Sequence, residues 1–405
     1  MATRTVLVLG GGVGGVVAAN ELRARLPAGD RVVVVDRERD QLFAPSLLWL
    51  MVGMRRPERL TKPIARYLRS GVELVTAEVQ AIDPAGRHVE TSTGELVADA
   101  LVIALGAELA PETTPGYAEA AHDFFALDGA ASFAGALAAF TGGRVAIAVT
   151  ALPFKCPAAP YEAALLVDAD LRRRALRERS EIDVYTPEPA PMPVAGPAMG
   201  GAVVALLDER GIRFHPNRPV RGYDPAGRSI AFADGGLAEY DLLAAVPPHR
   251  SPSAVRESGL ANPGGWIPVD SRTLATSAED VYAVGDCSAI PLSNGKFLPK
   301  AGVFAHAEAL VVADRIAAGF GAGAAPEFDG VGYCWVELGA GRAAFAVGEF
   351  FAEPDPTVAL RRPGRVWHAG KVAFERYWLG EGGGRTLAAL GLRLGSRLLG
   401  IPARL

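Results

Sequence analysis

The stretch Thr5–Gly15, with the sequence TVLVLGGGVGG, decides the fold of this chain. Its first five residues are apolar or β-branched, a composition that predicts a buried strand of a parallel sheet. The glycines that follow carry the spacing G-x-G-x-x-G, at Gly10, Gly12 and Gly15. The first glycine permits a tight turn, the second lets the backbone approach a pyrophosphate, and the third lets helix and strand pack closely. The stretch therefore predicts a dinucleotide-binding turn.

The residues after these glycines complete a β-α-β unit. A helix is predicted from Val16 to about Leu26, and its N-terminus would hold the pyrophosphate. A second strand, Arg31 to Val35, ends at Asp36, which lies about 20 residues beyond the last glycine and suits a ribose diol. Strand, glycines, helix, strand and acid stand in the required order, although this order alone does not separate FAD from NAD.

Composition limits the remaining interpretations. The chain has 405 residues, enough for two or three domains, and a net charge of -4, which argues against a nucleic-acid partner. Hydrophobic residues make up 50% of the chain, a share that hints at a membrane-facing surface, but no apolar run approaches the roughly 18 residues of a spanning helix. Three cysteines cannot form a secreted-type disulfide framework, so we expect a reducing compartment. No His/Cys cluster has the spacing of metal ligands, and no metal is expected.

Two later segments favour FAD. Ala100–Ala107 reads as a strand that ends in a small-residue turn at Gly106, and Val281–Asp286 reads as a strand that ends at Gly285-Asp286. Together with the N-terminal glycines, these segments resemble the FAD-binding signatures of flavoproteins that have two dinucleotide-binding domains. The resemblance implies that Asp286 contacts the ribityl and phosphate region of FAD.

A second doubly wound unit begins with a predicted strand, Arg144–Val149. The turn after it, Thr150–Glu162, contains no glycine and three prolines. Proline removes backbone N–H donors, and side chains at the former glycine positions block close approach of a pyrophosphate. We therefore expect this unit to keep its fold but to lack a nicotinamide site, and Cys156 stands where that cofactor would enter.

Several longer motifs resemble sulfide:quinone oxidoreductases and flavocytochrome c sulfide dehydrogenases, over about residues 4 to 380. They are Phe154–Glu162 (FKCPAAPYE), Val246–His249 (VPPH), Gly265–Asp270 (GWIPVD), the Gly285-Asp286 turn, Leu298–Ala305 (LPKAGVFA) and Phe328–Cys334 (FDGVGYC).

The resemblance implies a redox pair formed by Cys156 and Cys334. Sulfide would attack a disulfide or bridged sulfur between them and leave a persulfide, and the Cys334 thiolate would donate electrons to the flavin, from which a quinone takes them. It also places Lys300 near the pyrimidine edge of the flavin. Glu162 is the candidate for proton transfer near Cys156, although a carboxylate favoured by the helix dipole explains it equally well.

The chain also departs from the pattern. Many bacterial relatives carry a third cysteine upstream of the first, and the corresponding stretch Ala121–Phe125 has none. Cys287 is not one of the usual redox pair, and we expect a small buried residue beside the FAD.

The C-terminal tail predicts an amphipathic helix. After the glycines 382–384, expected to break the chain, leucines recur at helical spacing among arginines. They are Leu387, Leu390, Leu394 and Leu398, with Arg385, Arg393, Arg397 and Arg404. Such a helix suits a bilayer interface, where a lipid-soluble quinone is reached; the alternative is docking on the protein's own core or on a partner subunit.

The predicted fold class is α/β: two doubly wound Rossmann-like dinucleotide-binding domains plus a C-terminal α+β region with an amphipathic helical tail. Residues 1–115 with 260–325 would bind FAD, 116–259 would form the second Rossmann-like domain, and 326–405 would meet membrane and quinone.

The predicted protein is an FAD-dependent oxidoreductase that oxidises sulfide, or a related persulfide or thiol sulfur. It would lie peripherally on the cytoplasmic side of the cell membrane, pass electrons to a membrane quinone and bind no nucleic acid; homo-oligomerisation stays open. The alternatives are a type II NAD(P)H:quinone oxidoreductase, a flavocytochrome-type sulfide dehydrogenase subunit, and a flavin-binding redox sensor or scaffold.

Overall fold

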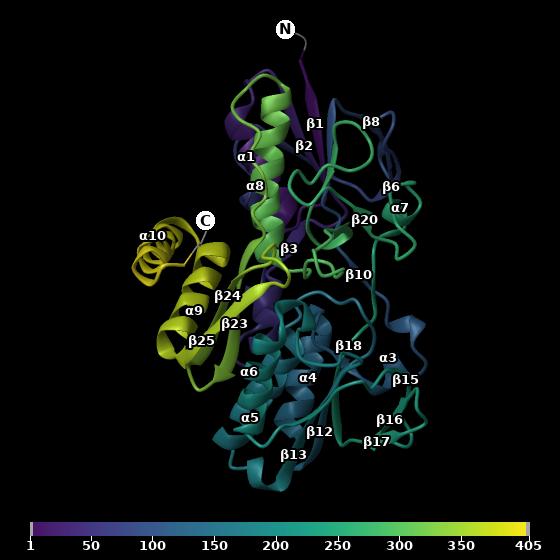
Figure 1. The fold of residues 1–405 in the computed structure, drawn as a ribbon, viewed down its shortest axis with the longest axis vertical. Coiled ribbons are helices and arrows are strands. Elements are labelled where there is room, and N and C mark those ends of the chain that lie inside the picture. The colour runs from purple at the N-terminus through teal and green to yellow at the C-terminus, as the bar shows by residue number, and fades with distance from the viewer. Residues whose placement is uncertain (1–2, 402–405) are drawn as a thin grey trace.

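Two parallel β-sheets of five strands each lie toward opposite ends of the molecule (Figure 1). The computed structural model describes residues 3–401. The first sheet has the order β21-β9-β1-β2-β5. Its strands are β1 (Thr5–Leu9), β2 (Arg31–Asp36), β5 (Val72–Thr76), β9 (Ala100–Ile103) and β21 (Val281–Ala283). The strands predicted within residues 5–9, 100–107 and 281–286 are therefore confirmed. They are β1, β9 and β21, and they lie side by side in one sheet.

The glycine-rich turn leads from β1 into α1 (Val13–Arg25), which packs against α8 (Gly302–Gly319). The helix begins three residues earlier than the sequence predicted, because Gly12 is its N-cap and the later glycines already lie in its first turn. Small elements complete this end of the molecule. They are β3 (Asp40–Leu42), β4 (Thr61–Pro63) and an antiparallel meander of β6 (Val79–Asp83), β7 (His88–Thr91) and β8 (Gly94–Val97). Helix α2 (Leu47–Met51) instead packs against α4 (Leu127–Ala139) of the second unit.

The second sheet repeats this plan, with the order β11-β18-β12-β13-β14 and parallel pairing throughout. Its strands are β11 (His122–Asp123), β12 (Gly143–Val149), β13 (Ser180–Tyr185), β14 (Arg213–His215) and β18 (Leu242–Val246). Its helices are α4 (Leu127–Ala139), α5 (Ala159–Arg173) and α6 (Pro197–Asp208). Its meander is β15 (Val220–Asp224), β16 (Ser229–Phe232) and β17 (Leu237–Glu239). Two doubly wound units are thus confirmed.

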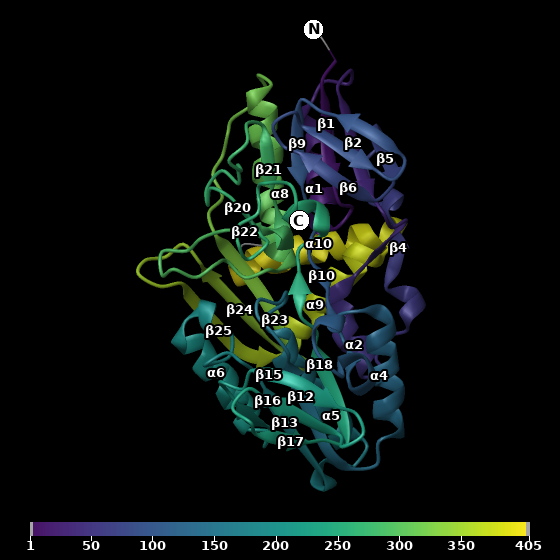
Figure 2. The same ribbon diagram turned by 90° about the vertical axis from the view of Figure 1, so that its right-hand side faces the viewer.

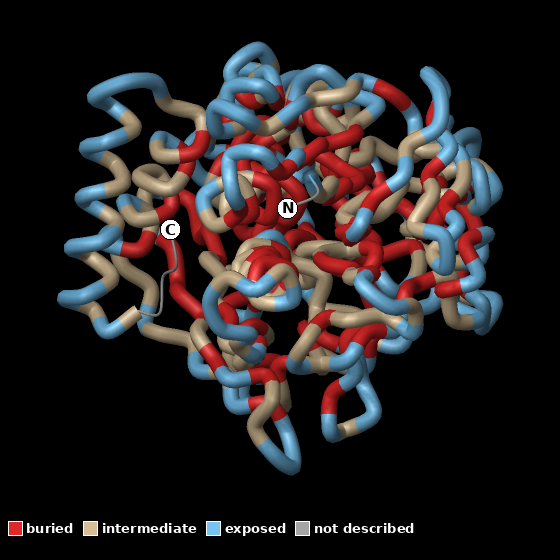
Figure 3. Tube along the Cα trace, turned by 90° about the horizontal axis from the view of Figure 1, so that it is seen from above, coloured by how far each residue is buried: buried red, intermediate tan, exposed pale blue. Residues whose placement is uncertain are grey.

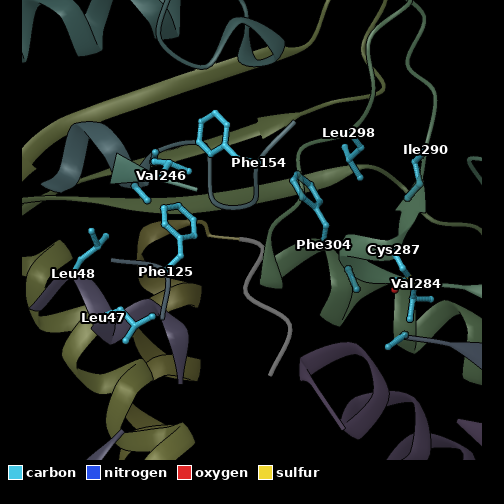
Figure 4. Close-up of a cluster of buried hydrophobic side chains, with 14 of the residues drawn as sticks. Leu47, Leu48, Phe125, Phe154, Val246, Val284, Cys287, Ile290, Leu298 and Phe304 are labelled. Carbon is cyan, nitrogen blue, oxygen red and sulfur yellow. Dashed lines mark hydrogen bonds between the residues drawn. The ribbon is translucent and has the colours of Figure 1, made fainter. Parts of the chain in front are cut away.

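Short pairings and a shared core join the two units. The crossing segments pair as β10 (Glu108–Leu109) with β19 (His249–Arg250), and β20 (Ile267–Pro268) pairs with β22 (Ser288–Ala289). Two short helices, α3 (Tyr117–Ala120) and α7 (Ser253–Arg256), follow the crossing strands β10 and β19 in the chain. One hydrophobic cluster spans both sheets, and Figure 4 shows side chains of the second unit (Phe125, Val246) beside those of α2.

The C-terminal region is an antiparallel sheet covered by helices, as the sequence predicted (Figure 2). Its elements are β23 (Val331–Gly339), β24 (Arg342–Glu349), β25 (Thr357–Gly364), α9 (Arg365–Leu379) and α10 (Gly382–Leu399). Helix α5 packs against β23, α9 packs against β24, and α10 packs against α9. Because β23 packs against α5, it places Cys334 beside the second unit.

The expected chain break at glycines 382–384 is wrong. These glycines begin α10, and the two helices separate at Gly380. A Cβ atom on Gly380 would lie 2.2 Å from the Arg376 carbonyl oxygen, whereas a Cβ on any of the three later glycines would meet nothing within 4 Å. The backbone therefore favours glycine at Gly380, through this close contact, and at Gly382, through a φ of +49°.

Helix α10 lies on the surface of the molecule, where it packs against α9. Figure 3 shows it in tan and pale blue on the outside of the molecule, and none of its residues is buried. Within residues 3–401, no helix combines the length and the hydropathy that a membrane crossing requires.

Candidate active site

The first glycine turn is held by backbone contacts that exclude other residues. Gly10 has a φ of +106°, and a Cβ atom there would lie 2.3 Å from the Ala104 carbonyl oxygen. A Cβ on Gly15 would lie 1.8 Å from the Gly10 carbonyl oxygen. Gly12 differs, because a Cβ there would meet nothing within 4 Å. Gly10 and Gly15 thus serve packing, and Gly12 leaves open space at the helix N-terminus where a phosphate group fits.

Asp36, the last residue of β2, supports the same turn. The Asp36 carboxylate accepts hydrogen bonds from the backbone N–H of Gly11 and, at 2.7 Å, from that of Glu38. From the other side, Gln41 Nε2 donates to the Gly11 carbonyl oxygen at 2.6 Å, and Trp378 Nε1 donates to Gln41 Oε1 at 2.7 Å. Helix α9 therefore helps to fix the glycine turn, a contact that the sequence did not indicate.

The turn after β21 lies next to the end of β9, because these strands pair in parallel. Gly106 and Gly285 both have positive φ, +70° and +73°. The Gly285 N–H donates to Glu308 Oε2 at 2.6 Å, and burial raises the pKa of Glu308 to about 7. Among residues 3–401, no hydrogen-bond donor to the Asp286 carboxylate is found. This edge thus offers a free carboxylate beside turns that require glycine.

Lys300 is largely buried and tied to the same turn. Its amino group donates to the carbonyl oxygens of Asp286 at 2.6 Å and Ser288 at 2.9 Å, and lies 3.7 Å from the centre of the Trp266 ring. Burial lowers the pKa of Lys300. Its contact with a flavin stays a prediction, but it clearly fixes the turn that carries Asp286.

The residues along this edge fit a dinucleotide cofactor such as FAD. Open space beside Gly12, the Asp36 carboxylate and the free Asp286 carboxylate lie at the carboxyl ends of β1, β2 and β21, where parallel sheets bind such cofactors. Cys287, next to Asp286, is fully buried, as predicted, and its thiol donates to the Ile103 and Val284 carbonyl oxygens.

We expect Gly15→Ala and Gly12→Ala to fail differently. The Gly15→Ala methyl group would clash with the Gly10 carbonyl, so the free energy of unfolding should fall by about 1–3 kcal/mol despite better helix propensity. Gly12→Ala should fold normally but retain less flavin. Urea unfolding and the flavin-to-protein absorbance ratio measure the two effects; equal stability of both variants would contradict the packing role of Gly15.

The turn after β12 presents Cys156 to the first unit. Cys156 has a φ of +56°, a left-handed conformation that costs a non-glycine residue about 1–2 kcal/mol. Its N–H donates to the Lys300 carbonyl oxygen at 2.8 Å, and its own carbonyl accepts the Ala159 N–H at 2.9 Å. These contacts place the Cys156 backbone against the segment that also fixes the Asp286 turn.

Strand β23 brings Cys334 to the same place. Cys156 and Cys334 are free thiols in this structure, and Cys334 Sγ donates to the Trp335 carbonyl oxygen at 3.2 Å. Cys334 lies close enough to Cys156, Glu162 and Lys371 for their charges to act on its pKa. The fold thus brings the two predicted cysteines together from distant parts of the chain.

A buried ion pair lies beside the two thiols. Lys371 Nζ donates to Glu162 Oε2 at 2.8 Å, and the Glu337 N–H donates to the same oxygen at 2.9 Å. Glu162 is 1% exposed and Lys371 5%. Glu162 does lie in the first turn of α5, but its partner is a lysine from the C-terminal helix α9.

Burial and charge act on the thiols in opposite directions. Burial raises the pKa of Cys156 to about 12 and that of Cys334 well above its usual value, and the Glu162 charge adds to both. Lys371 lowers both pKa values. Burial also lowers the pKa of Lys371, but the neighbouring carboxylates outweigh it and the pKa is raised. Lys371 therefore stays protonated and favours the thiolate forms.

Sequence reasoning missed Lys371, Glu337, His368 and Glu308. Lys371 stands in a segment, residues 367–379, that mixes aromatic and basic residues. A signal was present, because His368, Lys371 and Glu375 recur at helical spacing with Trp367 and Trp378, and residues spaced in this way share a face. The structure buries Trp367, Lys371, Glu375 and Trp378 of that face and leaves His368 half-buried.

Comparisons with known proteins agree with this arrangement. Residues 4–309 match the model of the family described as pyridine nucleotide-disulphide oxidoreductase. The chain is 26% identical over 397 residues to the sulfide-quinone reductase of Aquifex aeolicus, which covers 92% of this chain and 90% of that protein. It is 24% identical over 371 residues to the mitochondrial sulfide:quinone oxidoreductase of Mus musculus, covering 86% and 79%.

The X-ray structure of the sulfide:quinone oxidoreductase from Aquifex aeolicus has the same fold, with a TM-score of 0.81 at 24% identity over 97% of this chain and 92% of that one. The family model covers most of the chain, including both parallel sheets, and the full-length relatives agree in fold and extent. The protein is therefore an oxidoreductase that belongs to the pyridine nucleotide-disulphide oxidoreductase family and is similar, over nearly its whole length, to sulfide:quinone oxidoreductases.

Proposed function

We propose that this protein oxidises sulfide, or a related persulfide or thiol sulfur, at Cys156 and Cys334, and passes the electrons through bound FAD to a membrane quinone. The observation that carries the proposal is the meeting of these two thiols beside the buried Glu162–Lys371 pair. The similarity to proteins named sulfide:quinone oxidoreductase supports the substrate and the acceptor.

The sulfur step starts from a disulfide between the two cysteines. A hydrosulfide ion attacks Cys156, the Cys156–Cys334 bond breaks, and a persulfide on Cys156 and a thiolate on Cys334 result. The positive charge of Lys371 stabilises that thiolate. Bound FAD would supply a two-electron acceptor for the sulfur and a donor for the quinone.

FAD would be held by the first unit. The turn with Gly10, Gly12 and Gly15 and the N-terminus of α1 would receive the pyrophosphate, with the Asp36 carboxylate on a ribose. The rest of the FAD molecule would be held by Gly106, Gly285, Asp286 and Lys300. The proposed domains are residues 1–115 with 260–325 for FAD, 116–259 for the second Rossmann-like unit, and 326–405 for membrane and quinone contact.

The contacts of the second unit argue against a nicotinamide substrate. An acid after the second strand of such a unit normally binds a ribose. Here Glu188 follows β13 but is buried, and it accepts a hydrogen bond from the Tyr161 hydroxyl at 3.0 Å. With no glycine in the turn before α5, this unit offers neither a pyrophosphate site nor a free acid.

We expect sulfide, and not NADH, to reduce the flavin. The test follows flavin absorbance in an anaerobic stopped flow after mixing with each compound separately. Rapid bleaching by sulfide, followed by recovery on adding a soluble quinone, is the predicted result. Bleaching by NADH alone would overturn the proposal and favour an NAD(P)H:quinone oxidoreductase.

The exposed side chains of helix α10 support a peripheral position on the membrane, and we propose the cytoplasmic side as its location. Leu387, Leu390, Leu394 and Leu398 are between 51% and 85% exposed. Three arginines (385, 393 and 397) lie among them, whereas Arg404 falls outside the described residues. A helix with exposed leucines and basic side chains suits the interface of an anionic bilayer.

Replacing Leu390 and Leu394 with aspartate should release the protein from membranes. Burying one leucine contributes about 1.5–3 kcal/mol, so the double variant should bind at least ~100-fold more weakly. Flotation with vesicles of anionic phospholipid measures the bound fraction. Leu237→Asp, at an exposed leucine on β17, is the matched control. Unchanged flotation of the double variant would contradict the assignment.

A further inference from the structure

We propose that Glu308 is a positioning residue for the flavin: it holds the Gly285-Asp286 turn in the shape that binds FAD, and it takes up a proton when FAD binds. The inference rests on the FAD site of the proposed function and adds a residue that the sequence motifs did not indicate. Glu308 lies on α8 and has no part in the proposed sulfur chemistry.

Helix α8 contacts Gly285 through two residues of one face. The Gly285 N–H donates to Glu308 Oε2 at 2.6 Å, and a Cβ atom on Gly285 would lie 3.2 Å from the Ala305 Cβ. Residues 305 and 308 share a helix face because they are three positions apart. Glycine can adopt many backbone conformations, so these contacts help to select the one, with a φ of +73°, that presents Asp286.

The Glu308 carboxyl group is buried and has few competing partners. The residue is 2% exposed. Within residues 3–401, the Gly285 N–H is the one hydrogen-bond donor found for its side chain. A small cavity lies against Glu308 and is lined also by Gly285, Ser288 and Lys300. The carboxyl group therefore borders open space on the side of the turn, through which a proton can reach it.

The charged groups that act on Glu308 are Asp286 and Lys300. Burial is the largest cause that shifts the pKa of Glu308, and it raises this pKa to about 7. Asp286 raises the pKa as well, whereas the Gly285 hydrogen bond and Lys300 lower it. Helix α1 and strand β23 also pack against α8, but their described residues add no charged group to this set. Near neutral pH, Glu308 is therefore present in both protonation states.

FAD would shift Glu308 toward the neutral form. The pyrophosphate of FAD is negatively charged, and the proposed function places it at the N-terminus of α1, the helix that packs against α8. A like charge nearby disfavours the ionised form of a carboxyl group and raises its pKa. The Gly285 hydrogen bond does not prevent this shift, because Oε2 can accept it in either protonation state. The protein should therefore take up a proton from solvent as it binds FAD.

This uptake makes the affinity for FAD fall as pH rises. Below the pKa of the free protein, about 7, Glu308 is neutral with and without FAD, and the affinity is constant. Above that pKa, the free protein has lost the proton that the complex holds, so binding becomes weaker with each further rise in pH. The decline ends at the raised pKa of the complex. A shift of about one pKa unit between the two states corresponds to a change of about 10-fold in affinity.

The test is a titration of the full-length protein, freed of flavin by dialysis, with FAD at pH 6 to pH 8.5. Quenching of the flavin fluorescence gives the Kd. We expect the wild-type Kd to stay constant up to about pH 7 and to rise by roughly 10-fold at pH 8.5. Glu308→Gln keeps an acceptor for the Gly285 N–H but cannot ionise, so its Kd should not change with pH. Glu308→Leu removes the acceptor and should weaken FAD binding by about 10-fold or more at every pH.

Glu188→Gln is the matched control. Glu188 is also a buried carboxyl group whose pKa is raised by burial to about 7, but it follows β13 in the second unit, where the Tyr161 hydroxyl donates to it. This variant should reproduce the wild-type dependence of Kd on pH. Thermal unfolding confirms that each flavin-free variant is folded.

Three results would contradict different statements. A Glu308→Gln profile that follows the wild type would overturn the proton uptake, and folded Glu308→Leu with wild-type affinity would overturn the positioning role. If Glu308→Leu does not fold, the Glu308→Gln profile decides the inference by itself. A wild-type protein that binds no FAD at any pH would instead refute the proposed function.

Discussion

Replacing Cys334 with serine should slow sulfide-driven reduction of the flavin by roughly 10³-fold or more, as is typical when the nucleophile of a covalent mechanism is lost. A hydroxyl group can neither form the disulfide that hydrosulfide attacks nor leave as a thiolate. The positive charge of Lys371, which stabilises a thiolate at this position, then has no group to act on. Single-turnover absorbance of the flavin measures the effect, and Cys156→Ser should show a loss of the same size.

Cys287→Ser is the matched control for both variants. Cys287 lies next to Asp286, in the turn that we propose to bind FAD, but is fully buried, and its thiol bonds two backbone carbonyl oxygens that a serine hydroxyl can also reach. It should retain sulfide-driven reduction near the wild-type rate. If Cys287→Ser abolished the reaction and Cys334→Ser did not, the redox pair would have been assigned to the wrong thiols.

Replacing Lys371 with methionine should produce the largest loss of stability. The substitution leaves the Glu162 carboxylate buried without its partner, and breaking a buried ion pair in this way costs about 3–5 kcal/mol. Urea unfolding, followed by tryptophan fluorescence, measures the free energy of unfolding. Both thiol pKa values should also rise, because Lys371 lowers them in the native protein. Slower alkylation of the cysteines at pH 8 would report this change.

The stability loss in Lys371→Met should depend on pH. Burial already raises the pKa of Glu162, and removing Lys371 raises it further. Between the unfolded pKa, about 4.3, and the raised folded value, the folded state binds more protons than the unfolded state, so stability falls as pH rises. The deficit relative to wild type should therefore be smaller at pH 5 than at pH 8.

The double variant Glu162→Gln/Lys371→Met tests the electrostatic origin of this loss. With no uncompensated charge left, it should recover most of the stability and lose the pH dependence. A double variant as unstable as Lys371→Met at both pH values would mean that packing of the lysine stem, and not the charge of Glu162, accounts for the loss.

The parts of the site that lie in short continuous motifs were predictable from the sequence. Gly10, Gly12, Gly15 and Asp36 take part in one β-α-β unit, where spacing along the chain fixes position in space, and the structure confirms the strand, turn and helix. Burial of Cys287 was predicted for the same reason. The predicted position of the chain break between the last two helices was less reliable. The sequence pointed to glycines 382–384, but among these glycines and Gly380 only a Cβ atom on Gly380 would clash with a backbone atom.

The fold class follows from the amino-acid pattern, and so do the residues whose chemistry depends on local backbone: the glycine turns, the acid that ends β2, and a turn before α5 that lacks glycine. The surroundings of the cysteines depend on tertiary packing. Lys371 is the partner of Glu162 because α9 packs on the C-terminal sheet that also carries Cys334 and Glu337. The physical reason is that charge interactions depend on distance and burial, which periodicity along one helix cannot supply when the partner lies on a distant segment.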